Sequence, residues 1–304
     1  MLLRARSENV APRRLKGVGG RRYTLSRRGG RVVECGGLEN RYVGNPGVGG
    51  SNPPLSAAAG SPFASFYVPG GSPRARLEMS DYVSPDWGNA ALLTIDTQQD
   101  FTLPGAPAEI PGTAEVVPQM RRLVRAFRQW GRPVIHVVRI YRPDGSNVDL
   151  CRRRDVEGGR CVVLPGSDGA ELVDELKPSS RIRLDAERLL AGDLQPIGPM
   201  EWIMYKPRWG AFYHTPLEEH LANLRVNTVV ICGCNFPNCP RATIYEASER
   251  DLRVALVADA TSGVYERGLR ELENIGVGLV YGDQLSAISG QPKRVGAVQS
   301  LPES

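Results

Sequence analysis

From residue 90 onward, short apolar runs alternate with stretches of helical periodicity. The apolar runs are rich in Val, Ile and Leu, and they predict buried strands at 91–95, 133–138, 202–205, 228–231, 254–258 and 277–281. Helices are expected between them at 113–131, 216–224, 239–251 and 265–275. Strands that alternate with helices imply crossover connections. We therefore expect an α/β fold with a doubly wound, mainly parallel six-stranded sheet and helices on both faces.

Residues 141–200 interrupt this alternation. They contain turn-forming Pro143-Asp144-Gly145, a basic run at Arg152-Arg153-Arg154 and a Gly158-Gly159 pair. One short helix is expected near 170–176. A long irregular insertion in a compact domain is usually a lid or a binding loop, so we expect this role for residues 141–200.

Residues 1–78 have a different composition. They are rich in Gly, Arg, Ser and Pro and show no sustained hydrophobic period, which predicts a disordered basic extension. Gly50-Ser51-Asn52-Pro53 can be encoded by the T-arm sequence common to transfer RNA genes, and the run 36–57 resembles a translated serine tRNA gene. A mis-called start, with Met79 as the true one, is our preferred interpretation. A transit peptide or a basic nucleic-acid-binding arm remain alternatives.

Charge separates the two parts of the chain. The net charge of +5 arises from residues 1–78, which hold 12 Arg and one Lys against four Glu. Residues 79–304 carry 25 basic and 29 acidic side chains and should form one globular domain without a nucleic-acid-binding surface. No apolar run reaches membrane-spanning length, and no secretory pattern opens the chain. The six scattered cysteines are expected to be reduced thiols in a cytoplasmic protein.

The stretch from Val229 to Thr243 carries the most distinctive candidate chemistry. A β-branched run leads into a Gly-containing turn, and Asn238 and Pro240 are typical of a helix start. Cys239 is therefore predicted at a strand-turn-helix junction, where the positive end of a helix lowers the pKa of a thiol. The alternative interpretation is a small residue packed at a tight turn.

Two further polar residues follow predicted strands. Asp96 comes after the first strand, and Lys206 comes after the third. If the strand order is 3-2-1-4-5-6, the strands that carry Asp96 and Cys239 are neighbours where the order reverses, and that edge lines the ligand crevice. Taken singly, an Asp after a strand is often a turn residue and a Lys is often a solvated surface group. Together with the thiol, they match the needs of nucleophilic catalysis.

Residues 90–285 resemble the isochorismatase-like cysteine hydrolases. The resemblance rests on three motifs in order, namely Leu92-Leu93-Thr94-Ile95-Asp96-Thr97-Gln98-Gln99-Asp100-Phe101, Lys206-Pro207-Arg208-Trp209-Gly210-Ala211-Phe212, and the stretch around Cys239 followed by Val257-Ala258-Asp259-Ala260. It implies a catalytic triad of Asp96, Lys206 and Cys239 on a doubly wound sheet. It also implies a cis peptide bond between Cys234 and Asn235, an oxyanion hole from the N–H groups of Asn235 and Cys239, and a homo-oligomer.

The chain departs from the family pattern around the cysteine, where Phe236-Pro237-Asn238 precedes it and Pro240 follows. These departures affect pocket shape and hence substrate identity. Four aromatic residues are candidates for the substrate pocket: Phe101, Trp209, Phe212 and Phe236. The basic run at Arg152-Arg153-Arg154 is a candidate for holding a substrate carboxylate, but we favour a solvated face for it.

Histidine and metal chemistry are poorly supported. The chain has three histidines, and the segment 139–144 has none where nicotinamidases of the family place metal ligands, which argues against nicotinamide as substrate. A zinc site of Cys232, Cys234 and Cys239 with Cys151 or Cys161 has an unusual spacing. We expect no cofactor or metal, and a small-molecule substrate. The leading hypothesis is a metal-independent cysteine hydrolase that cleaves a C–N bond of a small amide or carbamoyl compound through a thioester at Cys239. The alternatives are vinyl-ether hydrolysis of the isochorismatase type and a catalytically silent scaffold.

Overall fold

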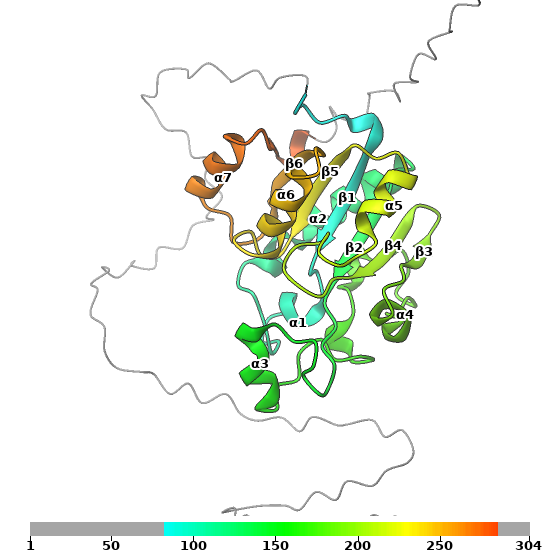
Figure 1. Ribbon diagram of the computed structural model, residues 1–304, viewed down its shortest axis with the longest axis vertical. Coiled ribbons are helices and arrows are strands. Elements are labelled where there is room, and N and C mark those ends of the chain that lie inside the picture. Colours follow the sequence, from blue (N-terminus) through cyan, green and yellow to red (C-terminus); the bar gives the residue numbers. More distant parts are fainter. Residues whose placement is uncertain (1–81, 285–304) are drawn as a thin grey trace, which may run out of the picture. The chain divides into compact units, whose positions relative to one another are not determined.

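A computed structural model describes residues 82–284 of the chain (Figure 1). The interpretations of residues 1–78 therefore lie outside the described residues. Within these residues the chain forms a seven-stranded sheet with the order β3-β4-β2-β1-β5-β6-β7. The strands are β1 (Ala90–Ile95), β2 (Val134–Val138), β3 (Gln195–Gly198), β4 (Glu201–Tyr205), β5 (Thr228–Gly233), β6 (Arg253–Thr261) and β7 (Gly278–Val280).

The sheet confirms the α/β, mainly parallel architecture. Each of the six predicted strands is present, and their order in the sheet is the expected 3-2-1-4-5-6. All neighbouring pairs among these six are parallel. The seventh strand, β3, pairs antiparallel with β4 at the edge. It was not predicted, because its sequence Gln-Pro-Ile-Gly contains no apolar run and proline is confined to sheet edges.

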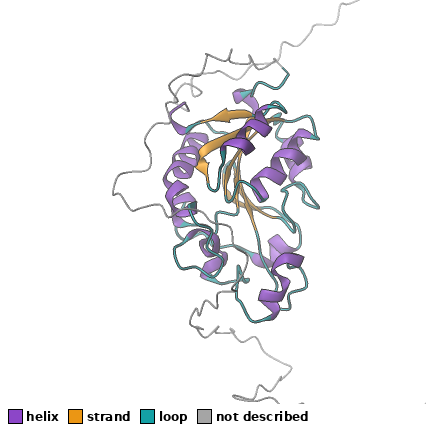
Figure 2. Ribbon diagram, turned by 90° about the vertical axis from the view of Figure 1, so that its left-hand side faces the viewer, coloured by secondary structure: helices purple, strands orange, loops and turns teal. Residues whose placement is uncertain are grey.

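Helices cover both faces of the sheet (Figure 2). They are α1 (Gln99–Thr102), α2 (Thr113–Gln129), α3 (Leu150–Glu157), α4 (Ala186–Leu190), α5 (Leu217–Asn223), α6 (Cys239–Ser248) and α7 (Glu266–Glu273). Short 3-10 turns occur at Trp87–Asn89, Asp168–Ala170, Asp174–Leu176 and Gly282–Gln284. The predicted helices thus correspond to α2, α5, α6 and α7.

Alternate residues of the central strands feed two separate cores. In β1, Leu93 and Ile95 belong to a cluster with residues of α5, α6 and α7, whereas Leu92 belongs to a cluster with residues of α2. All six residues of β1 and all six of β5 are buried. Complete burial on both faces explains why these strands read as continuous apolar runs. It also holds their carboxyl ends in a fixed position relative to each other.

Residues 141–200 are more regular than expected. They contain α3, α4 and β3 in addition to two 3-10 turns, whereas one short helix had been predicted. Helix α3 has the sequence LCRRRDVE and buries no residue. Its sequence therefore has no hydrophobic stripe from which a helix could be predicted. The first part of the insertion packs in a separate small core, which Tyr141, Val148, Val162, Val163 and Ala170 form together with Phe101 and Cys234 from outside the insertion. In Figure 1 this part, with α1 and α3, lies beyond the carboxyl ends of the parallel strands.

None of the helices within residues 82–284 is both long enough and apolar enough to cross a membrane.

Candidate active site

Two of the predicted site residues lie on either side of the end of β2. The backbone N–H of Asp96 donates to the carbonyl of Val137 at 2.9 Å, and that of Lys206 donates to the carbonyl of Val138 at 3.0 Å. Each residue thus prolongs the pairing of its strand by one position. Asp96 has a φ of 51°, a left-handed conformation that Asp tolerates better than most residues, and the chain turns away from the sheet there.

Asp96 and Lys206 form a buried ion pair. Lys206 Nζ donates to Asp96 Oδ2 at 2.9 Å and to the carbonyl of Arg208 at 3.3 Å. The side chain of Lys206 has no exposure and that of Asp96 has 5%. The second carboxylate oxygen, Asp96 Oδ1, is buried and receives no N–H or O–H hydrogen bond from the described residues. It is therefore available to accept a proton.

The end of β5 is held against Asp96. Gly233 has a φ of 122°, and a Cβ atom there would lie 2.2 Å from the carbonyl oxygen of Ile95, so only glycine fits. The N–H of Cys234 donates to the Ile95 carbonyl at 2.9 Å, and its thiol donates to the backbone carbonyl of Asp96 at 2.9 Å. The peptide bond between Cys234 and Asn235 is cis, as the family resemblance implies.

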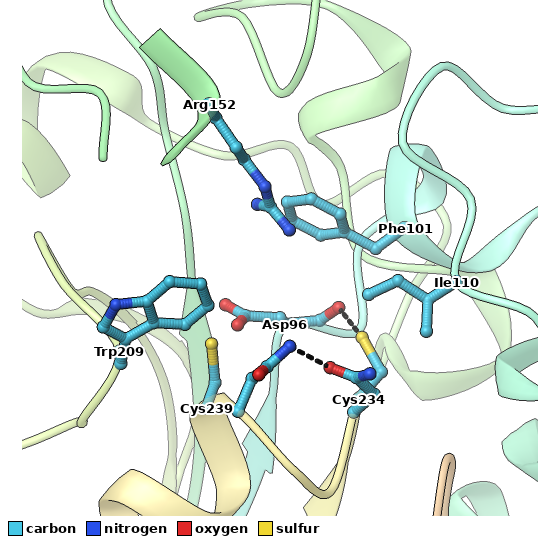
Figure 3. Close-up of a pocket in the computed structure, with 9 residues that line it drawn as sticks. Asp96, Phe101, Ile110, Arg152, Trp209, Cys234 and Cys239 are labelled. Atoms are coloured by element: carbon cyan, nitrogen blue, oxygen red, sulfur yellow. Dashed lines mark hydrogen bonds between the residues drawn. The ribbon is translucent and has the colours of Figure 1, made fainter. Parts of the chain in front are cut away.

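Helix α6 begins at Cys239, as predicted. Asn238 occupies the N-cap position, but its side chain does not cap the helix and instead donates to Asn235 Oδ1 at 3.0 Å. Cys239 is 6% exposed. In Figure 3 its sulfur points toward the carboxylate of Asp96. The structure thus brings Asp96, Lys206 and Cys239 together from β1, β4 and α6.

The electrostatic surroundings of Cys239 differ from the expectation. Burial raises the pKa of the Cys239 thiol, and the Asp96 carboxylate raises it further, whereas Lys206 and Arg139 act in the opposite direction. Burial and the neighbouring carboxylate thus act against the lowering of this pKa that was expected from the helix N-terminus. Both favour the thiol of Cys239 over its thiolate.

Two backbone N–H groups beside the thiol have no acceptor. Within residues 82–284, neither the N–H of Asn235 nor that of Cys239 donates a hydrogen bond to the protein. The N–H groups of the residues around them, such as Cys234 and Asn238, all donate to backbone carbonyls. Orphaned N–H groups next to a thiol are the arrangement that an oxyanion requires.

These groups line a small pocket, shown in Figure 3, with a cavity volume of about 10 Å³. Its lining residues are Asp96, Phe101, Ile110, Arg152, Trp209, Cys234, Asn235, Asn238 and Cys239. Phe101 and Trp209 therefore lie where they were expected. A cavity of this volume holds about one water molecule, so the pocket is narrow.

Phe212 and Phe236 are placed elsewhere. Both are buried in the core on the α6 side of the sheet rather than on the pocket lining. Phe212 packs under the guanidinium of Arg250, and Phe236 packs edge-on against Tyr265. Contrary to expectation, these two rings do not wall the pocket. Their loops turn them toward the helices, a direction that sequence spacing alone does not define.

Arg152 is the main residue that the sequence interpretation placed wrongly. We favoured a solvated face for the basic run, but the side chain of Arg152 is half-buried and lines the pocket. Ile110 and Asn238 were also not assigned to the pocket. The run of three arginines was the available signal for Arg152, but its direction depends on the path of the insertion.

A further cation lies close to the site. Arg139 follows β2 and is 1% exposed. Its Nη1 donates to Asp149 Oδ2 at 2.8 Å and to the carbonyl of Pro207 at 3.0 Å, and its guanidinium lies 5.7 Å from the Trp209 ring centre. Burial lowers the pKa of Arg139, but the negative charges around it, Asp96 first among them, raise that pKa overall.

Within residues 82–284, the cysteines considered as zinc ligands do not all lie on one side of the sheet. Cys232 packs in the core on the α2 side, whereas Cys239 packs on the opposite side. No group of three or more His, Cys, Asp or Glu side chains suited to a metal ion occurs in the part of the chain that the structure describes.

Comparison with known proteins gives consistent results. The family model of the isochorismatase domain matches residues 90–275. The "Probable inactive nicotinamidase At3g16190" of Arabidopsis thaliana is 33% identical over 63% of this chain and 91% of its own length. The N-carbamoylsarcosine amidase of Arthrobacter sp is 25% identical over 62% of this chain and 67% of its own length.

Among solved structures, an isochorismatase family protein from Desulfovibrio vulgaris subsp. vulgaris str. Hildenborough is 32% identical with a TM-score of 0.57. The match covers 67% of this chain and 99% of that protein. The family model spans more than half of this chain, and the fold agrees with that of the solved relative. The chain therefore belongs to the isochorismatase family of hydrolases.

Proposed function

We propose that the protein is a metal-independent cysteine amidohydrolase that cleaves a C–N bond of a small amide or carbamoyl compound through a thioester at Cys239. One observation carries the proposal. The Cys239 thiol faces Asp96, whose Oδ2 is held by Lys206 and whose Oδ1 receives no N–H or O–H hydrogen bond from the described residues. This arrangement supplies a nucleophile, a base and a fixed orientation for the base.

The first half of the reaction forms the thioester. Asp96 accepts the thiol proton, and the sulfur of Cys239 attacks the carbonyl carbon. The carbonyl oxygen takes the negative charge and accepts hydrogen bonds from the N–H groups of Asn235 and Cys239. The C–N bond then breaks, and the leaving nitrogen takes the proton from Asp96. Lys206 stabilises the Asp96 carboxylate before and after these transfers.

The second half releases the acid. Water attacks the thioester carbonyl while Asp96 accepts one of its protons. The C–S bond breaks, and the sulfur recovers a proton from Asp96, so the enzyme returns to its starting state. The raised pKa of Cys239 suits this cycle, because the thiol loses its proton to Asp96 only when an electrophile can accept the resulting charge.

The relatives support the class of reaction. One similar protein is named N-carbamoylsarcosine amidase, and the reaction of an amidase breaks a C–N bond. Vinyl-ether hydrolysis has no use for a thiol, so the pocket position of Cys239 weighs against that alternative. The small pocket limits the substrate to a compact molecule.

The proposal is tested by ammonia release from a panel of small primary amides and carbamoyl compounds. The wild-type protein is compared with Cys239→Ala and with Cys151→Ala, whose exposed cysteine serves as the matched control. We expect release by the wild type and by Cys151→Ala but not by Cys239→Ala. Rapid acid quench and peptide mass spectrometry should find an acyl group on Cys239.

A catalytically silent scaffold would give a different result. Ammonia release that survives in Cys239→Ala, with all variants folded, would overturn the assignment of the nucleophile. Hydrolysis of no amide or carbamoyl compound, with Cys239 never acylated, would favour the silent scaffold. The relative that is named a probable inactive nicotinamidase makes it advisable to extend the panel beyond nicotinamide.

A further inference from the structure

We propose that Arg152 binds a carboxylate of the substrate, so that the preferred substrates are anionic amides or carbamoyl compounds. This inference rests on the proposed function, since it specifies the substrate of the same pocket. It concerns a residue on the insertion helix α3, outside the three motifs that carry the family resemblance.

The position of Arg152 is the first argument. Its side chain lines the same small pocket as Cys239. The guanidinium lies 5.1 Å from the centre of the Phe101 ring, and Nη1 donates to the hydroxyl of Tyr141 at 3.1 Å. In Figure 3 the guanidinium points from α3 into the pocket, toward the side on which Asp96 and Cys239 lie.

The balance of charge is the second argument. Asp149 is paired with Arg139, and Asp96 is paired with Lys206. No carboxylate forms an ion pair with Arg152 within residues 82–284, and its one hydrogen-bond acceptor there is a neutral hydroxyl. These five groups comprise three cations and two carboxylates. The negative charge of Asp96 favours the Arg152 cation from beyond ion-pair distance, but that carboxylate is already paired with Lys206. A bound anion would give Arg152 a counter-ion of its own and offset the cost of its partial burial.

The neighbouring arginines provide an internal contrast. Arg154 is exposed, and Arg153 donates to the carbonyl of Val148 at 3.4 Å. Neither lines the pocket. The orientation of Arg152 is therefore specific to one position of the run, rather than a property of a generally basic helix. A guanidinium in this position can bind a carboxylate through two parallel N–H···O bonds.

The test uses a pair of alkylating reagents that differ in charge. Iodoacetate and iodoacetamide are close in size, and both transfer a carbon to a thiol with release of iodide. The ratio of their rates at Cys239, read by peptide mass spectrometry, therefore reports how well the pocket accepts an anion beside the thiol. This readout needs no amide hydrolysis.

We expect Arg152→Gln to lower the iodoacetate-to-iodoacetamide ratio at Cys239 about tenfold or more, because it removes a hydrogen bond between two charged groups. Arg154→Gln removes the same charge from the same helix and should leave the ratio unchanged. Arg152→Lys should retain part of the preference. An equal ratio in the wild type and in Arg152→Gln, or an equal fall in Arg154→Gln, would overturn the inference.

Amide hydrolysis supplies a second, independent measurement. Succinamate and succinamide differ in one carboxylate, and the wild type should favour succinamate in kcat/KM. Arg152→Gln should lower kcat/KM for succinamate more than kcat/KM for succinamide and so reduce this preference. If the wild type hydrolyses both amides equally, the inference that Arg152 binds a substrate carboxylate is wrong, and the proposed function remains intact. Selective labelling of Cys239 by iodoacetate, without hydrolysis of any amide, would support anion binding at Arg152 and would overturn the proposed function.

Discussion

Lys206 reaches across the end of β2 to Asp96, and the two side chains meet at 2.9 Å with almost no exposure to solvent. Their strands, β4 and β1, are not neighbours, because β2 lies between them. The pair therefore fixes two separate strand ends to each other. It also keeps the Asp96 carboxylate directed at the Cys239 side of the site.

Removal of one partner should be costly. We expect Lys206→Met to reduce the free energy of unfolding by ~3–5 kcal/mol, because it leaves the buried Asp96 carboxylate without its counter-ion. The double variant Asp96→Asn with Lys206→Met should recover much of this loss without recovering activity. Urea denaturation monitored by circular dichroism measures both quantities.

Lys177→Met is the matched control for this series. Lys177 is also buried, but its partner Asp174 is 65% exposed and can be solvated when the lysine is removed. The loss for this variant should stay near ~1 kcal/mol or below. Equal losses of unfolding free energy in the two lysine variants would contradict the view that the burial of Asp96 determines the loss of stability in Lys206→Met.

The charge of Asp96 should be visible in the titration of Cys239. Burial raises the pKa of this thiol, and Asp96 adds to the effect. We expect the alkylation rate of Cys239 by iodoacetamide to rise with pH through a midpoint above that of an ordinary cysteine. In Asp96→Asn, which loses the negative charge but keeps an oxygen for Lys206, the midpoint should move to lower pH.

Exposed Cys151 serves in the same samples as the internal standard for reagent activity. The Asp96→Asn variant should show the lower midpoint and yet hydrolyse amides far more slowly, since it lacks the base. An unchanged midpoint would show that the carboxylate does not act on the thiol. Hydrolysis by Asp96→Asn at the wild-type rate near neutral pH would place the base elsewhere.

Gly233 is required by a close approach of two strands. Gly233→Ala should lower the free energy of unfolding by at least ~2 kcal/mol, because the added Cβ meets the Ile95 carbonyl at 2.2 Å in a left-handed backbone conformation. Gly192→Ala is the matched control, with a φ of 97° and no atom within 4 Å of the added carbon. It should cost ~1 kcal/mol. Thermal unfolding compares the two variants, and a similar loss in both would exclude the contact with Ile95 as the cause.

A buried network away from the pocket predicts sensitivity to acid. Glu201 accepts hydrogen bonds from Arg128 at 2.6 and 2.7 Å and pairs with His136 at 2.7 Å. Burial raises the pKa of Glu201, but these partners outweigh it and lower the pKa below the usual 4.5. The stabilisation is therefore present above about pH 4.5, and it is lost as the pH falls through the lowered folded-state value.

We expect the free energy of unfolding of the wild type to fall steeply with pH in this acid range. Glu201→Gln should have a lower free energy of unfolding at neutral pH and a shallower fall in acid. Glu218→Gln, which removes an exposed partner of Arg250, should leave the slope unchanged. Chemical denaturation at a series of pH values provides the comparison. Parallel curves for the wild type and Glu201→Gln would rule out this carboxylate as the source.

The elements that the sequence predicted are those with a strong periodic signal. β1 and β5 are buried on both faces and read as continuous apolar runs, and the apolar stripe of α2 follows helical spacing. The three strand-end residues could be placed because parallel topology brings carboxyl ends to one edge. β3 and α3 lack such signals, since β3 contains proline and α3 buries no residue and has no apolar stripe.

The side-chain directions in loops could not be predicted in the same way. Phe212 and Phe236 both follow pocket residues closely in sequence, yet they turn into the core on the α6 side. Arg152 turns into the pocket from a helix whose position depends on the small core around Tyr141. The pKa of Cys239 depends on its burial, which the identity of its neighbours in sequence does not report.

The separate small core of the insertion has a consequence for how this enzyme can diversify. Asp96 and Lys206 follow strands of the sheet and Cys239 begins α6, whereas the segment around Tyr141 packs in a separate apolar cluster that Phe101 and Cys234 join. If the proposed function holds, reaction chemistry and substrate selection reside on segments with different packing. Replacement of residues 141–163 by the equivalent segment of a relative should change which compounds are accepted and leave the bond-breaking apparatus untouched, so this segment is the natural place to redesign selectivity.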